Sequence, residues 1–142
     1  MKYFISILIF SVSLSVQAAE SLSSKEDAQL LAEAVMESVS KDKLKDGLEK
    51  LRPYTVVPVA EFDVQMGQMD MKIPAIAQRF GKSIGYDFVE EEQLGESLIQ
   101  YVYLQKFEKH VMVWRFIFYK PKDKWLLNTW YFNDQIQLLF KH

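Results

Sequence analysis

Apolar residues recur at steps of three and four from about residue 25 to residue 80, and at steps of two from about residue 84 to residue 132. Steps of three and four place side chains on one face of an α-helix, whereas steps of two place them on one face of a β-strand. The chain therefore predicts helices followed by strands. This order is typical of the α+β class rather than of alternating α/β folds.

The first part of the chain predicts three helices. The stripe of the first, over residues 25–40, consists of Ala28, Leu31, Ala32, Val35 and Val39. Ser23 and Glu26 form a predicted capping box at its start. Leucines at 44, 48 and 51 predict a shorter helix over residues 42–51, which Pro53 ends.

The third predicted helix spans residues 59–80 and ends at Gly81. Its stripe consists of Phe62, Met66, Met69, Ile73, Ile76 and Phe80. Pro74 lies inside it and should kink or split the helix. Methionines in such a stripe either form ordinary core or provide an adaptable binding surface, and core packing is the commoner role.

Four strands are predicted near residues 84–92, 97–108, 111–120 and 124–132. The joints between them are short, so consecutive strands should be antiparallel neighbours in a meander. Residues 135–140 add either a fifth strand or a helical turn. We therefore expect three N-terminal helices packed on a curved four- to five-stranded antiparallel meander.

Residues 112–132 contain eight aromatic side chains, and in the strand predicted over 111–120 both parities of residues 111–119 are apolar except for Arg115. Helices on one side of the sheet leave the other side exposed, so some of these rings should face outward. Either a second copy covers them or the sheet curls over itself. The mixture of Tyr, Trp and Arg favours a homodimer through the sheet.

The N-terminus reads MKYFISILIFSVSLSVQAA, with one charge at Lys2, an apolar run, and small residues at Val16 and Ala18. This pattern predicts a signal peptide over residues 1–18, cleaved to leave a single domain over residues 19–142. A retained membrane anchor is the alternative, but the run is shorter than the roughly 20 residues of a spanning helix. We expect a periplasmic or secreted protein with no membrane attachment after cleavage.

Removal of residues 1–18 takes away one of the 17 basic side chains and none of the 19 acidic ones, which leaves a net charge near −3. Such a balance gives no general attraction to nucleic acid. The chain has no cysteine, so it has no disulfide and no thiolate metal site. His110 and His142 lack the companions of a metal site, no glycine-rich phosphate loop is present, and no cofactor is expected.

The order of helices and strands, the RFGKSIGYDFV passage from helix to strand and the FYKPKDKW hairpin resemble the nuclear-transport-factor-2-like superfamily over residues 25–140. The resemblance implies a cone-shaped α+β fold in which a curved sheet wraps around helices. The chain is similar to small exported members without assigned activity. Members often carry a strand between the second and third helices, and here only residues 55–57 could supply it. The superfamily includes isomerases, dehydratases and binding modules, so the fold does not select a function.

Arg115 stands between aromatic residues, where its guanidinium could hold a carboxylate ligand. Pairing with a neighbouring acid, or stacking on a ring, is the alternative role. Asn128 should lie close to it across the last hairpin. Together with Tyr101, Tyr103 and Trp130, these residues form the predicted ligand-binding set.

Catalysis would need a carboxylate aimed at a tyrosine hydroxyl inside the cone. Asp63 and Asp70 are the helical candidates, but seven residues place them about 10 Å apart, too far to share a proton. The acidic run at 90–92 could attract a cation or protect a solvated strand edge. The sequence favours an exported, non-enzymatic module for a small apolar ligand, a carboxylate or a protein partner. A small lyase or isomerase is the alternative.

Overall fold

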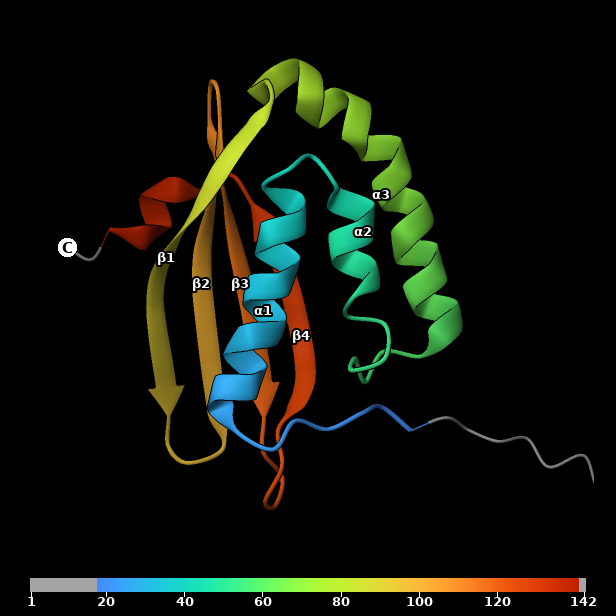
Figure 1. Cartoon of the computed structure of the whole chain (residues 1–142), viewed down its shortest axis with the longest axis vertical. Coiled ribbons are helices and arrows are strands. Elements are labelled where there is room, and N and C mark those ends of the chain that lie inside the picture. The colour runs from blue at the N-terminus through green and yellow to red at the C-terminus, as the bar shows by residue number, and fades with distance from the viewer. Residues whose placement is uncertain (1–17, 141–142) are drawn as a thin grey trace, which may run out of the picture.

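A computed structural model describes residues 18–140. It confirms the α+β class, because three helices precede a four-stranded antiparallel sheet with the order β1-β2-β3-β4 (Figure 1). The elements are α1 (Lys25–Val39), α2 (Leu44–Glu49), α3 (Val59–Phe80), β1 (Ser83–Leu94), β2 (Leu98–Phe107), β3 (Val111–Tyr119), β4 (Leu126–Asn133) and the 3-10 turn η1 (Ile136–Leu139). The predicted signal peptide lies outside the described residues, apart from Ala18. None of the helices in residues 18–140 combines the length and the apolar composition of a membrane-spanning segment.

The start of α1 differs by one residue from the predicted capping box. Ser24 is the N-cap, and its hydroxyl accepts a hydrogen bond from the Asp27 amide at 3.1 Å. Ser23 and Ser24 each precede an acidic residue by three positions, so the pattern alone did not separate the two serines.

The helices α1 and α2 pack closely through Gly47. A Cβ atom at this position would lie 2.8 Å from Cγ1 of Val39 and 3.1 Å from the carbonyl oxygen of Val35. Only glycine lets α2 approach α1 this closely. The contact therefore fixes the short distance between the two helices.

Pro74 does not split α3, which is one helix of 22 residues. Figure 1 shows it curving past α2 and leading into β1. Pro74 is exposed, so the carbonyl that its ring leaves without a partner can be hydrated. On the inner face Phe62, Met66 and Phe80 are buried.

The aromatic rings of the sheet turn mainly toward the helices. The rings in the core cluster or packed against it are those of Tyr86, Tyr101, Tyr103, Phe107, Trp114, Phe116, Phe118, Trp125, Trp130 and Phe132. The prediction that the rings divide between the two faces is therefore wrong for most of them. A register shift in β4 leaves Asn128 as an extra residue between Leu127 and Thr129. This bulge reverses the parity of the strand and brings Trp130 to the same face as Leu127.

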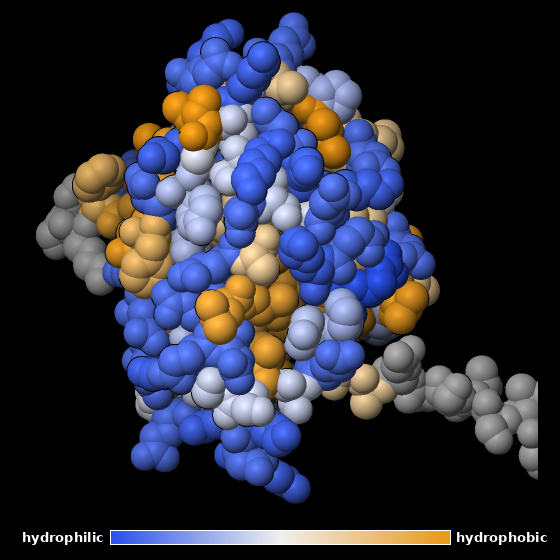
Figure 2. All heavy atoms as spheres, viewed as in Figure 1, coloured by the Kyte–Doolittle hydropathy of each residue, from blue (hydrophilic) through white to orange (hydrophobic). Residues whose placement is uncertain are grey.

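The outer face of the sheet carries aliphatic residues interspersed with polar ones such as Glu92, Gln100 and Arg115, and the C-terminal segment covers part of it. Val102 and Val113 alternate with the core residues of β2 and β3, yet they are buried. The turn η1 contacts β3 and lies on the side of the sheet away from the helices (Figure 1). Tyr119 and Tyr131 remain exposed on the strands. On the opposite side, hydrophilic side chains cover most of the surface between a few hydrophobic patches (Figure 2).

Candidate functional site

A cavity of about 380 Å³ lies between the C-terminal half of α3, the turn from α1 to α2 and the hairpin from β2 to β3. Its apolar lining consists of Val39, Leu44, Ile73, Ile76, Ala77, Phe107 and Met112. This volume falls within the range of small-molecule sites, which are mainly apolar with a few polar groups. The geometry suits a ligand that buries an apolar body.

Gln105 is the buried polar residue of the cavity lining, and its amide is already engaged by the protein. Nε2 donates to the carbonyl oxygen of Val39 at 2.9 Å and to the hydroxyl of Ser83 at 3.1 Å. Oε1 accepts from Nε1 of Trp114 at 2.9 Å. Both amide hydrogens are therefore used, and Gln105 ties α1, β1 and β3 together beneath the cavity.

Two carboxylates and two lysines surround the mouth of the cavity. Asp42 accepts from the Ser83 amide at 3.1 Å, and Glu108 accepts from the Lys82 amide at 2.9 Å. The acids thus fix the start of β1. Within residues 18–140, the ammonium groups of Lys82 and Lys109 form no ion pair. A ligand in the cavity would keep its polar end among these charges, at the solvent.

The predicted ligand residues Tyr101 and Tyr103 lie in the core beneath α1 and do not line the cavity. The hydroxyl of Tyr101 donates to the carbonyl oxygen of Lys25 at 2.7 Å. The buried hydroxyl of Tyr103 has no partner in hydrogen-bonding geometry among the described residues. Burial raises the pKa of both phenols well above the usual value. Both side chains are neutral core residues at physiological pH.

The other three predicted residues lie in three different places. Arg115 pairs with Val102 and Tyr131, which puts it on the outer face, half-buried and without an ion pair among the described residues. Asn128 is exposed in the bulge of β4. Trp130 faces the helices, with its ring 5.7 Å from that of Phe62. The structure therefore does not gather the predicted set into one site.

Sequence reasoning missed the cavity because separate elements build it. Ile73 and Ile76 belong to the recognised stripe of α3, and Phe107 and Met112 flank the β2–β3 turn. Nothing in the spacing shows that these two pairs meet around an open space. The signal available in the sequence was the length of the apolar stripe of α3, which runs over residues 62–80, whereas the stripe of the neighbouring short helix runs only over residues 44–51.

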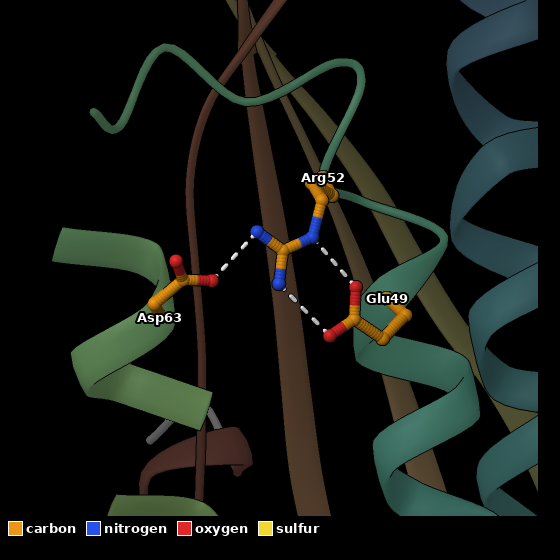
Figure 3. Close-up of polar contacts among 3 residues, drawn as sticks. All are labelled: Glu49, Arg52 and Asp63. Carbon is orange, nitrogen blue, oxygen red and sulfur yellow. Dashed lines mark hydrogen bonds and ion pairs between the residues drawn. The ribbon is translucent and has the colours of Figure 1, made fainter. Parts of the chain in front are cut away.

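The acids considered for catalysis are ion-paired on the surface. The Arg52 guanidinium contacts both oxygens of Glu49, at 2.7 and 2.9 Å, and Oδ1 of Asp63 at 2.7 Å (Figure 3). Its hydrogen bonds hold the pKa of Glu49 below the ordinary value. Asp70 pairs with Lys45 at 3.0 Å. These pairs fasten α3 to α2 and bring neither aspartate to a tyrosine hydroxyl.

The acidic run on β1 alternates between the two faces of the sheet. Glu91 lies opposite Tyr101 and pairs with Lys25 at 3.7 Å, whereas Glu90 and Glu92 lie opposite Val102 and Gln100. No group of three or more potential metal ligands is found in residues 18–140. A comparison with protein families, curated proteins and solved structures finds no match to this chain.

Proposed function

We propose that the chain is an exported, non-enzymatic binding module that holds a small apolar ligand in the cavity between α3 and the sheet. The observation that carries the proposal is the cavity of about 380 Å³ with its mainly apolar lining. Gln105 supports the proposal, because its side-chain amide already forms hydrogen bonds within the protein. An apolar ligand beside it would therefore leave no buried amide hydrogen unpaired. Export rests on the N-terminal sequence pattern.

We also propose membership of the nuclear-transport-factor-2-like superfamily. Three helices on one face of an antiparallel meander support it, as does an isolated parallel bridge between Thr55 and Leu127. This bridge lies between α2 and α3, where members of the superfamily often carry a strand. The cone of that superfamily would place a ligand between the sheet and the helices.

No observation favours the alternative of a lyase or isomerase. Asp63 and Asp70 are occupied by Arg52 and Lys45, and the candidate tyrosines lie in the core. The homodimer through the sheet stays a prediction. Leu98 and Tyr131 are exposed on that face, but η1 covers part of the area that a second copy would need.

The test uses a fluorescent apolar probe, 1-anilinonaphthalene-8-sulfonate, titrated into the purified protein. Ala77 is exposed, lines the cavity and lies on a helix, so Ala77→Phe should fill the mouth without burying a new polar group. We expect saturable binding by the parent and about tenfold weaker binding by the variant. Gln68→Phe is the matched control, because Gln68 is exposed on the same helix and does not line the cavity. Equal binding by all three proteins would refute the proposed site.

A further inference from the structure

The helix α3 has a second apolar stripe on its outward side. It consists of Ala60, Val64, Gly67, Met71 and Ala75, all of them exposed. At 100° per residue, these positions lie on the opposite side of the helix from the buried stripe that contains Phe62 and Met66. Met71 is 82% exposed and Val64 is 59% exposed. A surface helix normally presents charged and polar residues on this side.

We propose that this outward stripe binds the same stripe of a second copy, with the two α3 helices antiparallel. A two-fold axis through the middle of the seam, between Gly67 and Met71, places Gly67 of one copy opposite Met71 of the other. The same axis places Val64 opposite Pro74. Because the interface is isologous, each of these contacts occurs twice.

The shapes of the two central residues fit this arrangement. A Cβ atom at Gly67 would meet no atom within 4 Å, so the helix surface is open at that point. Met71 projects from the same face one turn further on, and its unbranched side chain fills such a recess readily. A parallel pair would instead set Met71 against Met71 and leave the two glycines facing a gap.

The charges beside the stripe also favour antiparallel pairing. Glu61 and Arg79 lie on the same flank at opposite ends of α3, so antiparallel helices bring Glu61 of each copy to Arg79 of the other. Glu61 forms no ion pair among residues 18–140. The side chain of Arg79 is 68% exposed, even though it contacts Asp134 at 3.1 Å, and can accept a second carboxylate. On the other flank of α3, Asp70 already pairs with Lys45 of α2, and Asp63 already pairs with Arg52, which follows α2.

The expected association is weak, because one pair of helices about 33 Å long forms an interface at the small end of the usual range. Sedimentation velocity on the full chain, expressed with its own N-terminus, should therefore show a monomer–dimer equilibrium at micromolar to submillimolar concentrations. Gly67→Glu should raise the dissociation constant about tenfold or more. The variant should fold at least as well as the parent, because glutamate favours the helix more than glycine does and the space is open.

Exchanging the charges of Glu61 and Arg79 provides a second test, again measured as the dissociation constant of the dimer. Glu61→Arg and Arg79→Glu should each weaken the dimer, and the double variant should restore association toward the parent value. Tyr131→Glu, on the outer sheet face, is the matched control and should leave this dimer unchanged. A chain that stays monomeric at the highest concentration, a Gly67→Glu variant that associates as the parent does, or a dimer that only Tyr131→Glu breaks would overturn the proposal.

Discussion

Replacing Gln105 by methionine tests the polar link beneath the cavity. The two side chains have similar size, so the change removes hydrogen bonds with little change in packing. Gln105 is 3% exposed and Trp114 is fully buried, so the lost contact of Nε1 has no replacement among the neighbouring protein groups. The carbonyl oxygen of Val39 keeps a hydrogen bond from the Asp42 amide at 3.1 Å. The loss of stability therefore comes mainly from the indole N–H of Trp114, which is left without a hydrogen-bond acceptor.

An unsatisfied buried donor costs about 1–3 kcal/mol, so we expect Gln105→Met to lower the free energy of unfolding by about 2 kcal/mol. For a domain of this size, the thermal midpoint should fall by roughly 6–10 °C. Urea denaturation followed by far-UV circular dichroism measures the change at equilibrium. The slope against urea should stay the same, because the surface exposed on unfolding hardly changes.

Gln100→Met is the matched control, because Gln100 is half-buried on the outer face of the same strand and its side chain forms no hydrogen bond among the described residues. We expect a change within about 0.5 kcal/mol. In a Trp114→Phe background no indole N–H remains, so Gln105→Met should cost about 1–2 kcal/mol less than in the parent. A cost below about 0.5 kcal/mol in the parent would refute the assigned role of Gln105.

Three further predictions concern the helices. Gly47→Ala should destabilise the protein by about 1–3 kcal/mol through overpacking, whereas Gly67→Ala should stabilise it by about 0.5–1 kcal/mol, both measured by urea denaturation. Ser24→Ala should cost about 1 kcal/mol in the same assay, and no loss would contradict the capping contact. The lowered pKa of Glu49 stabilises the fold above the unfolded value near 4.5 and loses its effect as the pH falls through the folded value. Arg52→Met should therefore lower the urea midpoint at neutral pH, and a difference from the parent that persists unchanged in acid would contradict this origin.

The positions of the helices and strands could be predicted from the sequence because they depend on periodicity. The third helix was predicted over residues 59–80, which are the bounds of α3, and the strand bounds differ by no more than two residues. The face of the sheet on which each side chain lies was less predictable. One extra residue, Asn128, reverses the parity of β4, and nothing in LLNTWYF marks a bulge at that position.

The cavity and the covered outer face depend on contacts between distant segments. The periodicity predicts that Ile76 and Met112 each lie on an apolar face, but it does not predict that both line the same cavity. The contact of η1 with β3 depends on how the chain turns after β4, and the sequence left open whether that tail forms a strand or a helical turn. Arg115 was recognised as an unusual residue, and its orientation followed only once the register of β3 was known.

A single helix thickness separates the cavity from the outward stripe of α3, with Ile73 on one side and Met71 on the other. If the cavity binds a ligand and the outward stripe pairs two copies, as proposed above, a shift of α3 on ligand binding would also act on the paired stripe. Thermodynamic reciprocity then requires that any effect of ligand binding on the affinity between the two copies equals the effect of pairing on the affinity for the ligand.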